Sequence, residues 1–141
     1  MKKTLIIMSI FLLAATSIVL AATQKSWIEM QNVIGSDAAG SAHIKEMESM
    51  ENGLQKIKIS INIKNLPVSE GKVFEGWLVD TDTGYKLSIG GFSTGADGKA
   101  VFYLKQQLVN FGLYDLIVVT EEPEGDTNPN PDTPILMGNL H

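Results

Sequence analysis

The sequence predicts an all-β protein, a single antiparallel β-sandwich of about seven or eight strands behind an N-terminal signal or anchor segment. Beyond that segment, apolar residues alternate with polar residues at a period of two rather than 3.6. Gly, Pro, Asn and Asp residues that favour turns separate the apolar stretches at short intervals. Short strands at this spacing, with no long helical pattern among them, are typical of an antiparallel sandwich.

The N-terminal residues have the pattern of a targeting segment. Lys2 and Lys3 precede an apolar run from Leu5 to Ala22, the pattern of a secretory signal. Cleavage after Ala21 would place small side chains at the positions that signal peptidase requires. The run is also close to the minimum length that spans a bilayer, so a retained anchor is the alternative.

Two regions therefore follow from the sequence. Residues 1–22 are expected to form a signal peptide or membrane anchor, and residues 23–141 one β-domain that is secreted, periplasmic or on the cell surface. The chain contains no Cys, so the domain forms no disulfide and binds no metal through thiolates.

The charge of the chain argues against nucleic acids as partners. The net charge is −5 and every basic residue is Lys, whereas nucleic-acid binders need a basic face and rely on Arg. We therefore expect no nucleic-acid binding. For the same reason we expect membrane contact only through the N-terminal segment, if that segment is retained.

The first expected strand is Trp27–Val33. The segment Ala22–Val33 that contains it pairs within its own domain or is donated to a neighbouring molecule, and pairing within the domain is the preferred interpretation. Isoleucines alternate with polar residues between Lys56 and Lys64, which indicates a strand with one buried face. The other expected strands are Ala42–Glu48, Val73–Asp80, Tyr85–Ile89, Ala100–Leu104, Tyr114–Thr120 and Ile135–Leu140. Lys105–Phe111 has weak helical character and is expected to form only a turn.

Asn52-Gly53 is a strong hairpin signal because both residues tolerate positive φ. A two-residue turn there would place Glu46 and Glu48 on the apolar face of the next strand. Either these glutamates lie beyond the core or the loop contains a bulge.

Both faces of Val73–Asp80 are largely apolar, so we expect a central strand that is covered on both sides. Gly76 would leave room there for a large neighbour such as Trp27 or Trp77. Core packing is the preferred role of these aromatic residues, and a ligand platform is the alternative.

The second half of the chain carries short motifs in a recognisable order. They are Val73-Phe-Glu-Gly-Trp-Leu-Val-Asp80, Gly84, Ile89-Gly-Gly-Phe92, Asp97-Gly98, Ile117-Val-Val-Thr-Glu-Glu-Pro-Glu-Gly125 and Pro134-Ile-Leu-Met-Gly-Asn-Leu140. This order resembles the extracytoplasmic C-terminal domain of anti-sigma-K factors of the RskA type. The resemblance implies a β-domain outside the membrane, joined through one transmembrane helix to a cytoplasmic sigma-binding segment. Only Met1–Lys3 precede the apolar run, so no sigma-factor binding is expected. A Cys pair proposed to sense redox state in some of these domains has no counterpart here.

No enzymatic motif is present in the sequence. His43 and His141 are the only histidines, and there is no nucleophile elbow, phosphate-binding loop or zinc-protease motif. We therefore expect no enzyme activity and no cofactor.

Two acidic turns suggest calcium as an alternative. Oxygen-bearing side chains alternate in both, as calcium loops require, although neither completes an EF-hand. The candidate ligands are Asp80, Asp82, Asp126, Asn128, Asn130 and Asp132. Ordinary exposed turns have the same composition, so this remains the weaker interpretation. Copper binding through scattered Met and His residues is weaker still, because no Met-x-x-Met or His-x-Met spacing occurs.

The preferred function is thus a non-catalytic exported β-domain that binds, senses or interacts with a protein or another envelope component. The alternatives are a Ca²⁺- or Cu-binding exported protein and a structural cell-surface or filament subunit. The loops Asp80–Gly84 and Glu121–Pro134 are the expected binding surface, because loops on a rigid scaffold commonly carry function.

Overall fold

The computed structural model describes residues 27–47, 50, 52–67 and 70–141, so the expected signal or anchor at 1–22 lies outside the described residues. None of the helical structure within the described residues has the length and apolarity to cross a membrane. The elements are β1 (Ile28–Asn32), β2 (Ala39–Glu46), β3 (Gln55–Lys64), β4 (Lys72–Val79), β5 (Lys86–Phe92), β6 (Ala100–Leu108), the 3₁₀ turn η1 (Phe111–Leu113), β7 (Leu116–Pro123) and β8 (Thr133–Asn139).

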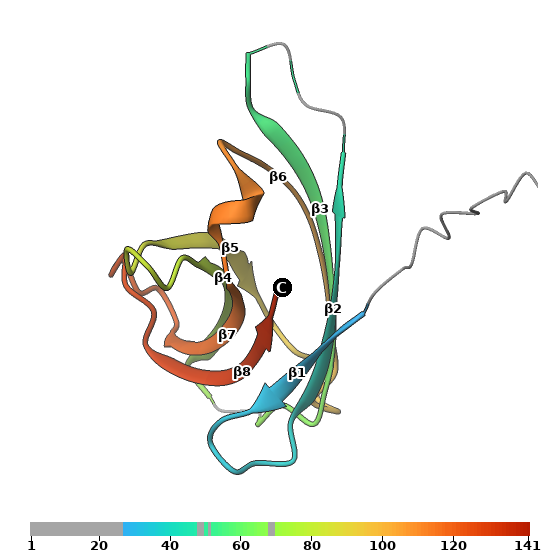
Figure 1. The fold of residues 1–141 in the computed structure, drawn as a ribbon. Helices are drawn as coiled ribbons and strands as arrows, with labels where there is room; N and C mark the ends of the chain where they lie inside the picture. The colour runs from blue at the N-terminus through green and yellow to red at the C-terminus, as the bar shows by residue number, and fades with distance from the viewer. Residues whose placement is uncertain (1–26, 48–49, 51, 68–69) are drawn as a thin grey trace, which may run out of the picture.

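All strand pairs are antiparallel, which confirms the all-β antiparallel prediction. The eight strands form one sheet in the order β5-β4-β7-β8-β1-β2-β3-β6, and this sheet curls until its two edge strands face each other (Figure 1). The expected sandwich of two separate sheets is thereby corrected to a nearly closed barrel. β1 joins the two halves because Ile28–Met30 pair with β2, whereas Gln31 and Asn32 pair with β8. The preferred interpretation of the first strand, pairing within its own domain, agrees with this arrangement.

The period-two pattern of β3 produces the core. Ile57, Ile59, Ile61 and Ile63 are at most 5 % exposed and point into the barrel, while the residues between them face outward. The edge strands β5 and β6 meet through aromatic packing, because the rings of Phe92 and Phe102 lie 5.3 Å apart. The Phe92 ring also stacks on Phe74 of β4 at 5.9 Å.

The hairpin between β2 and β3 resolves the register that the sequence left open. Ile57 is opposite Glu46, and the backbone hydrogen bond from Met47 N to Lys56 O closes a loop longer than two residues. Gly53 adopts φ +80°, as the turn signal predicts, whereas Asn52 does not adopt a positive φ. Glu46 is exposed at the end of β2, beyond the core, and accepts a hydrogen bond from Gln55. Glu48 lies outside the described residues.

Gly76 makes room for Ile89, and not for Trp27 or Trp77 as the sequence suggested. A Cβ at Gly76 would lie 2.8 Å from Ile89 Cγ1. The cause is a bulge in β5: Gly76 pairs with Gly90 and Trp77 with Ser88, so Ile89 is the additional residue and turns into the core. Trp27 is 44 % exposed and lies on another part of the barrel, with its ring 5.3 Å from that of His43.

Most strand limits differ from the expected ones by one to four residues, and two of the differences change the assignment of a segment. Lys105–Leu108 continue β6 instead of forming a turn, because the long β3 offers hydrogen-bonding partners as far as Gln55. Glu121 and Glu122 belong to β7 and not to the following loop, because β7 pairs with β4 as far as the pair Pro123–Lys72. The expected central position of β4 is confirmed, since it lies between β5 and β7.

Candidate functional site

The two loops expected to form the binding surface lie at opposite ends of the β4–β7 pair. The Asp80–Gly84 turn follows Val79, which pairs with Leu116. The β7–β8 loop leaves from Pro123, which pairs with Lys72 at the start of β4. The structure therefore separates the two groups of candidate calcium ligands.

In the Asp80–Gly84 turn, the Asp80 side chain is 9 % exposed and holds the turn together. Asp80 Oδ1 accepts hydrogen bonds from the backbone N–H groups of Asp82 (2.9 Å) and Thr83 (3.1 Å). Asp80 Oδ2 accepts from Thr83 Oγ1 at 2.6 Å. The Thr83 hydroxyl and N–H hold the pKa of Asp80 below its ordinary value, because they stabilise the carboxylate form.

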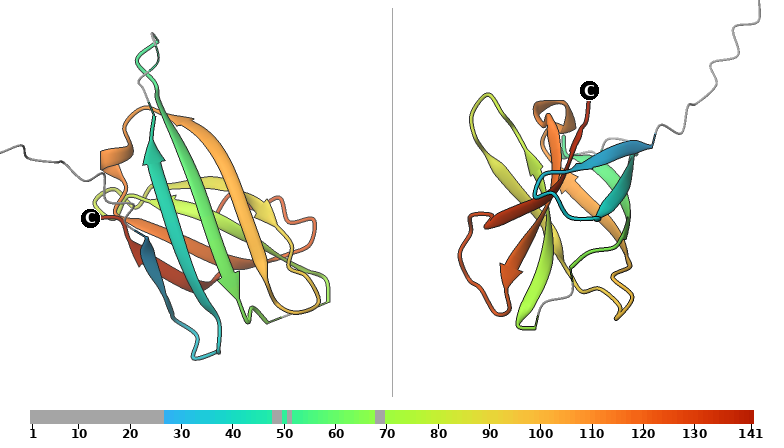
Figure 2. Two further views of the ribbon diagram at one scale, coloured as in Figure 1. Left: turned by 90° about the vertical axis from the view of Figure 1, so that its right-hand side faces the viewer. Right: turned by 90° about the horizontal axis from the view of Figure 1, so that it is seen from below.

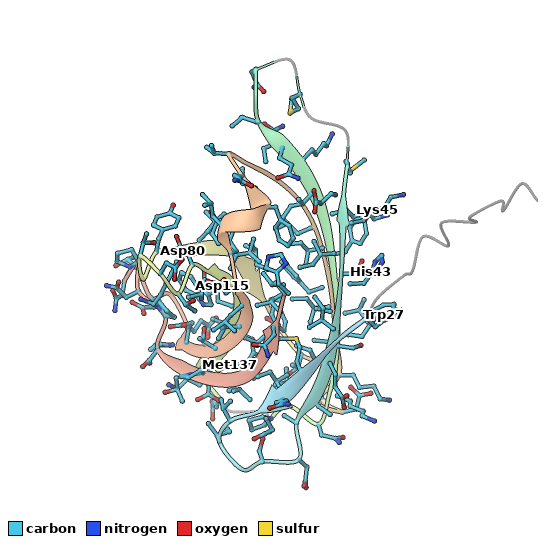
Figure 3. All side chains as sticks on the ribbon, in the orientation of Figure 1. Trp27, His43, Lys45, Asp80, Asp115 and Met137 are labelled. Carbon is cyan, nitrogen blue, oxygen red and sulfur yellow. The ribbon has the colours of Figure 1, made fainter. Side chains whose placement is uncertain are left out.

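Asp115, which is not among the candidate calcium ligands, also binds this turn. Asp115 Oδ2 accepts hydrogen bonds from Thr81 N at 2.8 Å and Thr81 Oγ1 at 2.6 Å. These bonds lower the pKa of Asp115 and tie the turn to the start of β7. Figure 3 shows Asp80 and Asp115 on the same side of the molecule, away from Trp27, His43 and Lys45.

Beside this turn, a pocket of about 420 Å³ opens at the mouth of the barrel. Its lining includes Leu54, Leu87, Leu108 and Tyr114, and exposed apolar side chains stand at its rim. Tyr85, Val109 and Leu113 of that rim are 57 %, 77 % and 54 % exposed. Burial raises the pKa of Tyr114, so its hydroxyl stays protonated at neutral pH. We call this set of lining and rim residues the apolar mouth.

The loop between β7 and β8 uses its polar side chains to shape its own backbone. Asp126 Oδ1 accepts from Asn128 N at 2.9 Å, and Asn128 Oδ1 accepts from Asn130 N at 3.1 Å. These are Asx turns, which favour the observed conformation without a metal. Asp132 N donates to Glu122 Oε1 at 2.9 Å.

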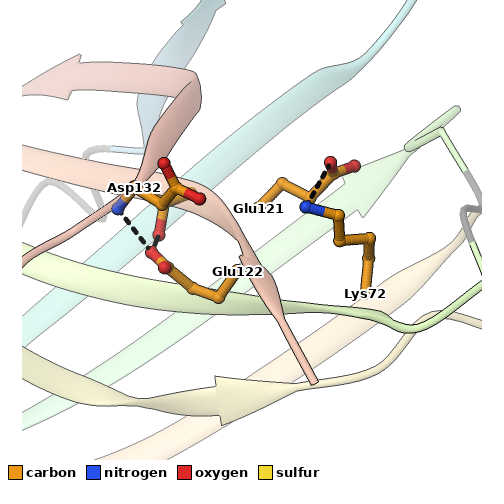
Figure 4. Close-up of polar contacts among 5 residues, drawn as sticks. Lys72, Glu121, Glu122 and Asp132 are labelled. Atoms are coloured by element: carbon orange, nitrogen blue, oxygen red, sulfur yellow. Dashed lines mark hydrogen bonds and ion pairs between the residues drawn. The ribbon is translucent and has the colours of Figure 1, made fainter. Parts of the chain in front are cut away.

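Glu122, which the sequence analysis assigned to the Glu121–Pro134 loop, is a buried carboxylate of β7. It is 3 % exposed, and its Oε1 accepts from Asp132 N and from Thr120 Oγ1 (Figure 4). Thr120 Oγ1 in turn accepts a hydrogen bond from Trp77 Nε1 at 2.8 Å. The neighbouring Glu121 pairs instead with Lys72 at 3.8 Å. Glu122 thus connects the loop to Trp77.

Trp77 is buried on the outer face of the sheet. It is 3 % exposed, yet it stands apart from the main core cluster. Together with Val118, Met137, Pro131 and Pro134 it lines a pocket of about 260 Å³ between the sheet and the β7–β8 loop. The expectation that β4 is covered on both faces is therefore confirmed.

Within the described part of the chain, no three His, Cys, Asp or Glu residues lie close enough together to hold a metal ion. Met30 is buried in the core, while His43 and His141 lie against the different rings of Trp27 and Phe111. Binding of calcium or copper stays a prediction from the sequence.

The comparison with protein families decides the identity. The model of the family described as anti-sigma-K factor RskA, C-terminal, matches residues 10–135, nearly the whole chain. The chain belongs to this family. The RskA C-terminal domain is a non-enzymatic domain of anti-sigma factors and is typically extracytoplasmic. Neither the curated proteins nor the solved structures give a significant match.

The structure shows which features of the fold the RskA-type motifs form. Ile89-Gly-Gly-Phe92 contains the β5 bulge and the aromatic contact at the edge of the sheet. The stretch from Ile117 to Gly125 supplies both a core strand and the buried Glu122. One signal could have located Glu122: in the alternation of β7 it shares a face with Val118 and Thr120, opposite Ile117 and Val119.

Proposed function

We propose that this protein is a non-catalytic exported domain that binds a protein or another envelope component outside the membrane. Family membership supports the location and the absence of catalysis. The apolar mouth supports the binding role and is the observation that carries it. Exposed apolar side chains gathered around a pocket are typical of interaction sites, whereas scattered ones are ordinary on protein surfaces.

The mouth has the composition that protein interfaces favour. Tyr85 and Tyr114 present aromatic rings 6.5 Å apart, and Val109 and Leu113 add apolar surface at the rim. Asp80, whose carboxylate is held by the adjoining turn, lies in the lining and adds a polar group. Aromatic residues at the centre of a site and polar groups near it match the usual anatomy of a binding patch.

Because the chain has no Cys, single cysteines can report on location and occupancy. The test compares Leu113→Cys in the mouth with Asn128→Cys in the β7–β8 loop, using a membrane-impermeant maleimide. We expect both variants to react in intact cells. Leu113→Cys should react at least about tenfold more slowly in cells than as purified protein, because the mouth is occupied, whereas Asn128→Cys should react equally in both. Equal rates for Leu113→Cys would contradict binding at the mouth, and no reaction of either variant would contradict the location.

The calcium alternative requires its own measurement. Asp126, Asn128, Asn130 and Asp132 are replaced together by Ser, and melting temperatures are compared with Ca²⁺ and with a chelator. We expect calcium to change the melting temperature of neither protein, because these side chains already serve the loop backbone. A rise with Ca²⁺ in the wild type that the variant lacks would establish a metal site.

A further inference from the structure

Four of the described lysines of this acidic protein lie on one face of the barrel. Lys56, Lys58 and Lys64 point outward from β3, because they alternate with its buried isoleucines. Lys45 of β2 is the cross-strand partner of Lys58 and shares that face. We call these four outward lysines of β2 and β3 the cationic face. Figure 2 shows β2, β3 and β6 side by side, with no described element over their outer side.

The register places like charges directly opposite each other. Lys45 of β2 pairs with Lys58 of β3. Like charges in such cross-strand positions destabilise a sheet unless an anion compensates them. The outward positions of β2 and β3 hold no carboxylate. Glu46, at the exposed end of β2, lies opposite Ile57 and accepts a hydrogen bond from Gln55, and Glu29 of β1 lies opposite Ser41. Ion pairs between described residues involve only Lys72 and Lys99.

Aromatic side chains accompany these lysines. Lys58 Nζ lies 4.7 Å from the centre of the Tyr103 ring, and Tyr103 is 52 % exposed. Trp27 stands beside His43 at the N-terminal margin of the same face (Figure 3). Lysine with exposed Trp and Tyr is the combination that favours the interface between membrane and water.

The apolar run before the described residues indicates which surface lies against the cationic face. The apolar run ends at Ala22, and the chain from Ala22 to Trp27 spans at most about 18 Å. The family match begins at residue 10, so residues 10–22 of this run fall within the matched region. A retained anchor would therefore hold Trp27 and the adjoining cationic face near the lipid headgroups.

We propose that the cationic face docks on the anionic headgroups of the membrane that carries the anchor. The net charge of −5 disfavours contact with an anionic membrane for the molecule as a whole, but it does not describe the local charge of the cationic face. Asp80 and Asp115 lie on the opposite side from Lys45 (Figure 3), so the docked orientation keeps these carboxylates away from the lipid. This surface is separate from the apolar mouth and leaves the mouth free for a partner.

The test is lysine footprinting of the full chain in lipid vesicles. The chain is reconstituted in phosphatidylcholine alone or with about one-third phosphatidylglycerol, and labelling by an amine-reactive reagent is read by mass spectrometry. We expect Lys45 and Lys58 to be labelled about fivefold more slowly with the anionic lipid, and Lys86 and Lys99 at an unchanged rate. The protection should disappear near 0.5 M salt, where screening lengths are only about 4 Å.

Matched variants separate this proposal from its competitors. Lys45→Gln/Lys58→Gln should abolish the protection of Lys56 and Lys64, whereas Lys86→Gln/Lys99→Gln removes the same charge and should leave it intact. Three outcomes would overturn the proposal. The first is equal labelling of Lys45 and Lys58 in both kinds of vesicle. The second is protection of these lysines by soluble polyphosphate in phosphatidylcholine vesicles, with no protection by phosphatidylglycerol. The third is protection in phosphatidylcholine vesicles that rises with protein density, which would indicate that a second copy of the chain covers the face.

Discussion

At the scale of single residues, Trp77 shows that a side chain on the outer face of a sheet is buried when a loop covers it. Its apolar neighbours come from β4, β7 and β8, and its indole N–H is satisfied by Thr120. A large aromatic residue contributes strongly to stability wherever it is removed from water, so this second cluster adds to the main core.

Replacing Trp77 by Ala should lower the free energy of unfolding by about 3–5 kcal/mol, because the side chain loses its transfer energy and leaves a cavity. Trp27→Ala is the matched control and should cost about 0.5 kcal/mol, since Trp27 is 44 % exposed. Urea denaturation measures both changes. A loss below about 1 kcal/mol at Trp77 would mean that the β7–β8 loop does not cover it in solution.

At the scale of elements, the β4–β5 turn is held by two aspartates of different origin. Asp80 caps its own turn, as Asp residues commonly do. Asp115 directly precedes β7 and lies 34 residues from Thr81, which donates hydrogen bonds to its carboxylate. The first contact is predictable from the local sequence, whereas the second depends on strand pairing.

These bonds make the turn sensitive to acid. The pKa values of Asp80 and Asp115 are lowered by folding, so their stabilisation is complete above the ordinary value of 3.8 and is lost as the pH falls through the lowered values. Thr81→Val should therefore lower the melting temperature at pH 7, and the difference from wild type should shrink steadily below pH 3.8. Thr127→Val, in the exposed β7–β8 loop, is the control and should change neither the melting temperature at pH 7 nor its dependence on pH. A pH-independent effect of Thr81→Val would assign it to packing instead of the Asp115 bond.

At the scale of the whole molecule, closure of the barrel depends on side chains and not on a complete hydrogen-bond ladder. β5 and β6 are the two ends of the strand order. The tilted ring pair of Phe92 and Phe102 bridges them, and Phe92 also stacks on Phe74. Gly90 of β5 adopts φ +114°, a backbone conformation that favours glycine, and lies in contact range of the Phe102 ring.

This arrangement predicts where the barrel opens first. In Phe102→Ala, the amides of β5 and β6 should exchange with deuterium at least about tenfold faster, while those of β7 and β8 stay near their wild-type rates. Tyr103→Ala is the control, because Tyr103 points outward and is half exposed. Uniform acceleration in every strand would indicate global destabilisation and no local opening at the seam.

The sequence alone determined the strand content, most strand positions and the family, because period-two alternation, turn residues and motif order are local properties. It identified the lysines between Lys56 and Lys64 as a solvated face, and Asp80 as part of a turn. Only the tertiary structure decided that one sheet curls on itself, that Ile89 fills the space at Gly76, and that Glu122 is buried. The same holds for the cross-strand pair of Lys45 and Lys58 and for the rim of Tyr85, Val109 and Leu113. These features depend on register and bulges between strands far apart in the chain, and a shift of one residue would move every side chain to the other face.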